Sequence, residues 1–228
     1  MEYVIETENI CRFFGEDDLR AAALDDVSIQ IKPGEFSAVI GPSGSGKTTF
    51  LQLVGGLDNP TSGKILLSGM NIAEMTNREL SDFRRDHIGF IFQSYNLIPV
   101  LSAEENIEYI MLLQDIPASK RHERVREMLF LVGLEGLGDR RPAQLSGGQQ
   151  QRVAVARAMA SGPDIILADE PTANLDSATG ASLLDIMRRL NEEQNMTFVF
   201  STHDRNIMDR ARRLIHLHDG KIESDEIK

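Results

Sequence analysis

The stretch from Gly41 to Thr48, which reads Gly-Pro-Ser-Gly-Ser-Gly-Lys-Thr, constrains the fold of this chain more than any other segment. Its spacing is that of a phosphate-binding loop, G-x-x-x-x-G-K-[ST]. Residues 36–40 before it have the character of a strand, and residues 47–57 after it have the character of a helix. This order places backbone N–H groups around phosphate oxygens at the start of a helix. The sequence therefore predicts an α/β unit that binds the phosphates of a nucleotide.

Individual residues of this loop have expected contacts. Lys47 places a positive charge on the outer phosphates, and the hydroxyl of Thr48 is positioned to bind Mg²⁺. The alternative is a glycine-rich turn without a ligand, which the strand–loop–helix context disfavours. The other loop residues expected to bind the nucleotide are Gly41, Ser43, Gly44, Ser45, Gly46 and Thr49.

A second stretch, Leu145–Gln149, is a serine–glycine turn that runs into a helix beginning near Gln150. Such a turn also holds phosphate through backbone N–H groups. One nucleotide does not need two such cradles from one chain, so the pair predicts that two copies share each nucleotide. A flexible turn is the alternative, and it would not explain the long helix that follows. The residues expected to contact the phosphate here are Ser146, Gly147, Gly148 and Gln149.

Polar residues also follow apolar segments at points where strands are expected to end. Asp169 and Glu170 end one such segment, Gln93 follows another, and His203 follows a third. Ligands bind at the carboxyl ends of parallel strands. We therefore expect Asp169 to bind Mg²⁺ and Glu170 to polarise the water that attacks the γ-phosphate. Gln93 would contact Mg²⁺ or that water, and His203 would hydrogen-bond the γ-phosphate. Taken singly, each could be an ordinary surface residue; their shared placement favours the site.

The bulk composition limits the partners. Of 228 residues, 41% are hydrophobic and 26% charged, as in soluble globular proteins. The net charge of −11 disfavours a large nucleic-acid interface, which would need a basic surface. Cys11 is the only cysteine, so no intrachain disulfide is possible, which fits a reducing cytosol. No apolar run approaches the roughly 20 residues that span a bilayer, so work at a membrane would require docking on another chain.

Apolar strands alternate with helices in two parts of the chain, residues 1–93 and 163–228, and predict a mainly parallel sheet covered on both faces. Residues 94–162 have helical periodicity, and we expect a helical subdomain inserted into an α/β core. The acidic tail, residues 223–228, is expected to be frayed. Further strands are expected at residues 3–10, 27–31 and 64–67.

Taken together and in this order, the motifs resemble those of ABC transporter ATPases. The resemblance covers essentially the whole chain, and the serine–glycine turn is its most specific part because ordinary phosphate-loop enzymes lack it. It implies one domain, residues 1–228, with a P-loop NTPase (RecA-like) core, a mainly parallel sheet, an N-terminal antiparallel β part and the inserted helical subdomain. The matching segments look like the family's Walker A loop, Q-loop, signature motif, Walker B strand with catalytic glutamate, D-loop and switch histidine: Gly41–Thr48, Gln93, Leu145–Gln149, Ile165–Glu170, Ala173–Asp176 and His203.

The resemblance implies that two such domains meet head to tail with two ATP molecules between them. The Walker A loop of one copy and the signature motif of the other would hold each ATP, and Asp176 would link the two sites at the interface. The family usually stacks the adenine on a tyrosine, and Phe14 aligns with that position. A phenylalanine keeps the π face and loses the hydroxyl, which leaves strict choice of ATP over GTP open. A plain core role is the alternative for Phe14.

Four further segments resemble those of the ATPases of lipoprotein release, macrolide export and cell division. These drive export, extraction or transmembrane mechanical signalling through a separate permease. The resemblance implies a peripheral place at the cytoplasmic face of the inner or plasma membrane. Tyr95, Leu97 and Ile98 are the residues expected to contact the permease. The segments that carry this closer resemblance are Gly55–Asp58, Arg84–Asp86, Ile88–Gln93 and Tyr95–Pro99.

Two other classes of function are alternatives. A soluble ABC ATPase of DNA repair or chromosome organisation would carry a long coiled coil or zinc insertion between Lys47 and Ser146, where this chain has only the helical segment. A regulatory module that binds ATP without hydrolysis would not need both Glu170 and His203. The sequence thus favours a hydrolysing transporter subunit over both.

Overall fold

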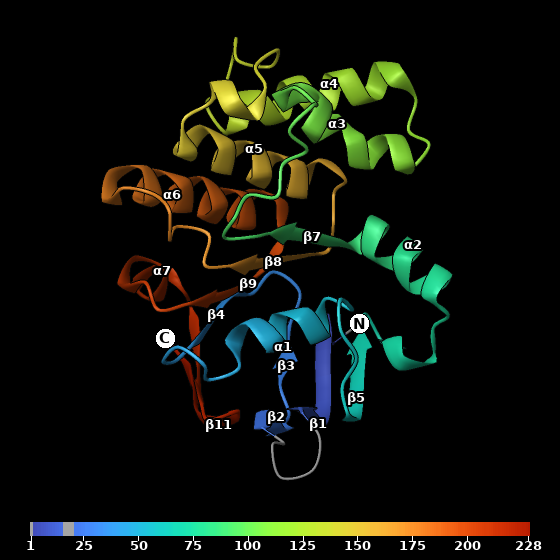
Figure 1. The fold of residues 1–228 in the computed structure, drawn as a ribbon, viewed down its shortest axis with the longest axis vertical. Helices are drawn as coiled ribbons and strands as arrows, with labels where there is room; N and C mark the ends of the chain where they lie inside the picture. Colours follow the sequence, from blue (N-terminus) through green and yellow to red (C-terminus); the bar gives the residue numbers. More distant parts are fainter. Residues whose placement is uncertain (1, 16–20) are drawn as a thin grey trace.

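The computed structural model describes residues 2–15 and 21–228. A six-stranded sheet runs through the middle of the molecule in the order β11-β10-β4-β9-β8-β7 (Figure 1). The strands from β10 to β7 are parallel to one another, and β11 pairs with β10 in the antiparallel sense. This confirms the predicted mainly parallel sheet. The strands are β4 (Phe36–Ile40), β7 (Ile88–Ile91), β8 (Ile165–Asp169), β9 (Thr197–Thr202), β10 (Arg213–His218) and β11 (Lys221–Ile227).

Side chains alternate along these strands and feed two hydrophobic cores, one on each face of the sheet. On β9, Phe198 and Phe200 lie in a first core that includes apolar residues of α3 to α7. Val199 points to the opposite face, into a second core with α1 and the N-terminal strands. Successive residues of a strand face opposite sides, so a sheet covered on both faces has near-continuous apolar strands. The central strands are therefore buried on both sides.

The second sheet is antiparallel and five-stranded, as predicted for the N-terminal part. The expected strand 27–31 is wrong in its bounds, because Val27 ends β2 and only two residues form β3. Most of β2 was missed because its alanines and aspartates have low strand propensity; it forms by pairing with β1. The strands are β1 (Ile5–Phe14), β2 (Ala21–Val27), β3 (Gln30–Ile31), β5 (Ser62–Leu67) and β6 (Met70–Asn71).

The helices lie on both sides of the central sheet. Figure 1 shows α1 between the two sheets, with α5 and α6 on the opposite face of the central sheet. Gly89 of β7 permits close packing of α5, because a Cβ there would overlap the carbonyl oxygen of Ala158. The helices are α1 (Lys47–Val54), α2 (Asn77–His87), α3 (Ala103–Leu113), α4 (Ala118–Leu131), α5 (Gly147–Ala160), α6 (Ser177–Gln194) and α7 (Arg205–Arg210), with short 3₁₀ helices η2 (Ile72–Glu74) and η3 (Pro142–Gln144).

Helix α2 was not predicted, because its sequence is mostly charged and only Phe83 is buried. A local signal for it was nevertheless present. Thr76 and Glu79 form a capping box, in which each side chain accepts from the backbone N–H of the other. Within the described part of the chain, no helix is both long enough and apolar enough to cross a membrane.

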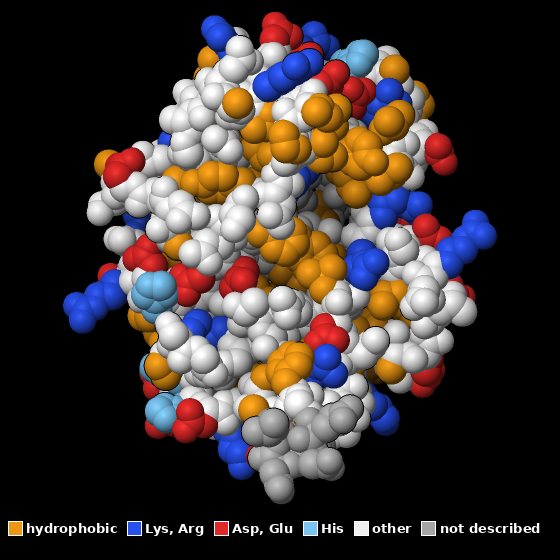
Figure 2. All heavy atoms as spheres, in the orientation of Figure 1, with side chains coloured by type: hydrophobic (Ala, Val, Ile, Leu, Met, Phe, Trp, Pro, Cys, Tyr) orange, Lys and Arg blue, Asp and Glu red, His pale blue; other side chains and the backbone are white. Residues whose placement is uncertain are grey.

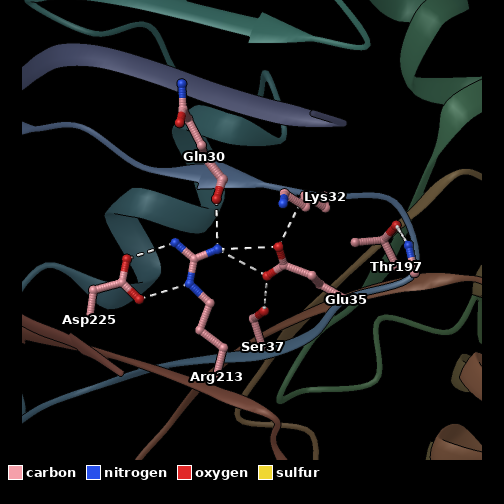
Figure 3. A network of polar contacts seen from close by, with 8 residues as sticks. Gln30, Lys32, Glu35, Ser37, Thr197, Arg213 and Asp225 are labelled. Atoms are coloured by element: carbon pink, nitrogen blue, oxygen red, sulfur yellow. Dashed lines mark hydrogen bonds and ion pairs between the residues drawn. The ribbon is translucent and has the colours of Figure 1, made fainter. Parts of the chain in front are cut away.

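The acidic tail is not frayed, in contrast to the prediction. Residues 221–227 form β11, which pairs with β10 along its length. Arg213 on β10 binds both carboxylate oxygens of Asp225, each at 2.7 Å, and also donates to Glu35 and to the carbonyl oxygen of Gln30 (Figure 3). These contacts raise the pKa of Arg213 above its ordinary value, and the hydrogen bonds to Asp225 contribute most. A cation on the neighbouring strand thus holds the acidic segment in place.

We expect Arg213→Ala to lower the free energy of unfolding by about 2–4 kcal/mol, because it leaves Glu35 and Asp225 without their cation. Arg213 is 13% exposed, so the loss is not fully compensated by water. Urea denaturation measures the effect. Arg188→Ala is the control, because its pair with Glu192 is half exposed and contributes little. Equal midpoints for the two variants would contradict the role given to Arg213.

Candidate active site

The phosphate loop joins β4 to α1, as predicted. The Nζ atom of Lys47 donates to the carbonyl oxygens of Gly41 and Pro42, both at 2.9 Å, and the Lys47 side chain is buried. Gly46 has a φ of 102°, and a Cβ there would overlap the carbonyl oxygen of Ala23 on β2. Only glycine fits this position. The loop is thereby wrapped around one ammonium group.

The other predicted loop residues differ in exposure. Ser43 and Gly44 are exposed, and Thr49 is half-buried in the first turn of α1. Ser45 is 1% exposed, and its hydroxyl has no hydrogen-bond partner among the residues that the structure describes. Buried hydroxyls are rarely left unpaired, so this one calls for a ligand or water.

Thr48 and Asp169 come together from α1 and the end of β8. The Thr48 hydroxyl lies 3.0 and 3.1 Å from the two carboxylate oxygens of Asp169. Mg²⁺ prefers such oxygen ligands and binds through one or two protein groups plus substrate phosphates and water. Within residues 2–15 and 21–228, no cluster of three His, Cys, Asp or Glu residues could hold a metal alone. The donor set therefore fits Mg²⁺ that arrives with a nucleotide.

Glu170 has a strained backbone. Its φ is 46°, in the left-handed region that residues other than glycine avoid. Its carboxylate lies 2.7 Å from Nδ1 of His203 and accepts from the hydroxyl of Thr202 at 3.2 Å. The Glu170 side chain is 15% exposed and the His203 side chain 72%. Such strain costs about 1–3 kcal/mol and is typical of functional positions.

The strand order brings the predicted polar residues to one edge of the sheet. Ile91 of β7 pairs with Ala168 of β8, one residue before Asp169. Gln93 therefore follows a strand adjacent to the Asp169 strand, and it is exposed. Asp169 pairs with Ser201 of β9, the strand that leads to His203. The structure thus gathers the four predicted strand-end residues, although they are spread over more than one hundred positions of the sequence.

The signature segment forms the start of α5. Ser146 is the N-cap: its hydroxyl accepts from the N–H of Gln149 at 3.3 Å, and the side chain of Gln149 accepts from the N–H of Ser146 at 2.9 Å. A Cβ on Gly148 would lie 2.6 Å from the methyl of Thr179. Gly147 and Gly148 supply N–H groups at a helix start, which attract anions. Sequence reasoning identified this cradle but not the capping box that builds it.

The two cradles lie on different layers of the molecule. Apolar residues of α1 belong to the second core, and those of α5 belong to the first core, across the sheet. The two glycine segments of one chain therefore begin helices on opposite faces of the sheet (Figure 1). Asp176 lies beside the signature segment, where it caps α6. Hydrogen bonds from Thr179 lower the pKa of Asp176, and the one from the Thr179 side chain contributes more than the one from its backbone.

Three contacts that the sequence did not reveal tie these segments together. Arg157 of α5 donates to the carbonyl oxygens of Tyr95 and Asn96, at 2.9 and 2.5 Å. Both of these residues have positive φ, 60° and 49°. Asn174 donates to the carbonyl oxygen of Gln93 at 2.8 Å. Burial lowers the pKa of Arg157. Carbonyl contacts of this kind leave no mark in the sequence.

Two further contacts hold the segment after Glu170. Gln151 of α5 is fully buried and donates to the carbonyl oxygen of Pro171 at 2.7 Å. Thr172 donates to Asp204, directly after His203, at 2.7 Å. Burial alone would raise the pKa of Asp204, but hydrogen bonds from Thr172 and Asn206 hold it below its ordinary value. The Glu170 and His203 loops are thus fastened to one another and to α5.

Phe14, the predicted base platform, ends β1 and is 45% exposed. It is therefore not a core residue. It pairs with Ala21 of β2, two residues before Ala23, whose carbonyl oxygen faces Gly46. Phe14 thus lies on the strand pair next to the phosphate loop.

The family model described as ABC transporter matches residues 24–173, which contain the phosphate loop, the signature segment and the Asp169–Glu170 strand. The chain belongs to the ABC transporter family. This ABC protein is an ATPase cassette, which confirms the expected class of enzyme. It is 45% identical over 226 residues to an ABC transporter ATP-binding protein of Thermotoga maritima, covering 99% of this chain and 96% of that relative.

Other relatives include permease fusions. The macrolide export ATP-binding/permease protein MacB of Aggregatibacter actinomycetemcomitans is 44% identical over 225 residues. That match covers 99% of this cassette but 35% of the length of MacB. Among solved structures, a dimer of the ATP-binding cassette MJ0796 bound to ADP and Pi is 42% identical, with a TM-score of 0.91 over 98% of both chains. The fold prediction is thereby confirmed.

We expect Arg157→Lys to lower the ATPase rate several-fold, because the planar guanidinium uses a separate nitrogen for each of the two carbonyl oxygens and lysine has one nitrogen in their place. The two left-handed residues after Gln93 would then lose their common partner. Phosphate release at saturating ATP measures the rate. Arg124→Lys is the matched control, since Arg124 also donates to two carbonyl oxygens of α5, those of Met159 and Ala160, away from Gln93. If both variants lost the same fraction of activity, the loss would reflect stability alone.

Proposed function

We propose that two copies of the cassette close head to tail over two ATP molecules, and that hydrolysis drives a separate membrane permease. The observation that carries this proposal is the placement of the two phosphate cradles on helices of opposite sheet faces. A nucleotide bound at Gly41–Thr48 does not use the signature segment of the same chain. That segment can therefore contact the nucleotide bound on a second chain. The relative MJ0796 was solved as a dimer with ADP and Pi, which supports this arrangement.

Lys47 and the loop N–H groups bind the outer phosphates, while Ser43, Ser45 and Thr49 add hydroxyls around them. Thr48 and Asp169 hold Mg²⁺, with Gln93 as the third protein contact. When bound, Mg²⁺ neutralises negative charge that develops on the phosphates during transfer. The hydroxyl–carboxylate pair at 3.0 Å supports this assignment.

Glu170 orients the attacking water and accepts its proton, while the bond between the γ-phosphorus and the bridging oxygen breaks. His203 holds the carboxylate of Glu170 in place and reaches the γ-phosphate from its exposed position. The signature residues Ser146 to Gln149 bind the γ-phosphate of the nucleotide on the other copy. Asp176 lies between the sites, and hydrogen bonds from Thr179 lower its pKa.

The permease docks in an apolar groove of about 420 Å³ between the helical part and the sheet. Figure 2 shows hydrophobic side chains gathered around this hollow. Leu57, Tyr109 and Leu113 line it and are each 43–47% exposed. An exposed apolar surface of this kind marks an interaction site. An apolar helix of the membrane partner fits it.

Asn96 lines the groove, whereas the predicted contacts Tyr95, Leu97 and Ile98 are its neighbours in the chain and are not part of the lining. Leu97 and Ile98 are half-buried, and the Tyr95 hydroxyl lies 3.0 Å from the position of a Cβ on Gly147. A partner in the groove would therefore press on the chain between Gln93 and the signature segment. The permease holds the cassette at the cytoplasmic face of the membrane.

The chain works as a single domain in which residues 94–162 form the helical subdomain and residues 1–93 and 163–228 the core. The transporter role is favoured over DNA repair because the relatives are named as transporter proteins and the net charge is −11. Hydrolysis is favoured over a regulatory role because Glu170 and His203 are both present and in contact.

We expect Glu170→Gln to abolish turnover while ATP binding remains, because the amide cannot accept the proton of water. The trapped nucleotide should hold two copies together, which size-exclusion chromatography with ATP and Mg²⁺ detects. Ser146→Arg added to Glu170→Gln should return the protein to monomers, because the arginine fills the interface. A monomeric preparation that hydrolyses ATP at full speed would contradict the shared site.

We expect Leu113→Asp to leave the ATPase rate of the isolated cassette unchanged and to abolish co-purification with the permease encoded by the neighbouring gene. The aspartate would place a charge in the apolar groove. Phe130→Asp is the control, because Phe130 is 63% exposed on α4 outside the lining of that groove. Equal loss of permease with both variants would argue against the groove as the docking site.

A further inference from the structure

Arg12 lies over the ring of Phe14. The Cζ atom of its guanidinium is 4.7 Å from the ring centroid, which is a cation–π contact. Both residues belong to β1 and are two positions apart, although the pairing with β2 is irregular around Arg12. Figure 1 shows this end of β1 beside β2.

Arg12 is itself anchored from the far end of α1. Its Nη2 atom donates to one carboxylate oxygen of Asp58 at 3.0 Å, and its Nε atom forms an ion pair with the other oxygen at 2.9 Å. The two side chains are 24% and 28% exposed. Thr61 fastens the same turn to β1, since its N–H donates to the carbonyl oxygen of Cys11 at 2.7 Å. A charge-assisted hydrogen bond together with this ion pair keeps the guanidinium beside Asp58.

The anchored ring lies close to the phosphate cradle. Phe14 pairs with Ala21, and Ala23 on the same strand contacts Gly46 of the phosphate loop. Two residues of strand correspond to about 7 Å, which is within the length of a nucleotide. Helix α1 thus carries the phosphate cradle at its first residue and leads to Asp58, four residues beyond its end.

We infer that Arg12 is a positioning residue for the purine base of the nucleotide. This rests on the proposed binding of ATP at Gly41–Thr48. The guanidinium holds one face of the Phe14 ring, and the exposed remainder of the ring stacks on the base. Asp58 prevents the cation from leaving the ring for water. A ring held in place before binding loses less freedom when the base arrives.

The test compares ATP with inorganic tripolyphosphate, which has the phosphates and no base. Arg12→Ala should raise the KM for ATP about two- to tenfold, the range expected for a cation–π contact, with kcat unchanged. Inhibition of the ATPase by tripolyphosphate should stay the same. Arg12→Lys should recover part of the loss because it keeps the charge, and Asp58→Asn should raise KM in the same direction as Arg12→Ala.

A double mutant separates positioning from general destabilisation. If Arg12 acts through the ring, Arg12→Ala combined with Phe14→Ala should have the KM of Phe14→Ala alone. Lys64→Ala is the control, since it removes an ion pair with Glu8 of the same strand without touching the ring. It should leave KM unchanged.

Weakened inhibition by tripolyphosphate in Arg12→Ala, or additive effects in the double mutant, would overturn the inference. So would an unchanged KM. Failure of the proposed function would look different: Lys47→Ala would then still bind ATP, as measured by equilibrium dialysis. Loss of ATP binding in Lys47→Ala together with an unchanged KM in Arg12→Ala refutes the role of Arg12 only.

Discussion

Alternation of side chains along the parallel strands is the constraint on which the rest of this structure depends. Phe198 and Phe200 face one core and Val199 the other, and the neighbouring strands follow the same rule. Both faces of the sheet must then be covered by helices. The helix that begins with the phosphate loop covers one face, and the helix that begins with the signature segment covers the other. The proposed division of labour between two copies rests on this placement of the two helices.

The carboxyl edge of the sheet concentrates the chemistry. Parallel strands deliver Asp169, Glu170 and His203 to one side because their ends are in register. The left-handed backbone of Glu170 stores strain one residue beyond β8, and contacts from Thr202 and His203 hold it there. The groove proposed as the docking site of a membrane partner lies near this edge, and the residues after Gln93 connect the two. If the proposed function holds, nucleotide and partner influence one another through this short stretch of chain, which hydrogen bonds from Arg157 and Asn174 hold in place.

Prediction from sequence succeeded where the signal is local. The phosphate loop, the apolar strands of the central sheet and the serine–glycine turn each depend on spacing within a few residues, and they lie where expected. It failed for β2, α2 and the acidic tail, which have weak propensity or weak periodicity. These segments are ordered by partners far away in the chain. The tail needs Arg213, and β2 needs β1.

The sequence by itself determined the kind of chemistry, because a phosphate loop, paired acids and a signature turn are specified by which residues follow one another. Only the tertiary structure decided how these parts are held. Arg157 on two carbonyl oxygens, Arg12 between Phe14 and Asp58, and the hydroxyl of Thr48 against Asp169 all join positions remote in the chain. Such contacts depend on the packing of strands and helices, and backbone carbonyls carry no residue-specific mark. The physical reason is that pairing across space has no fixed spacing along the chain.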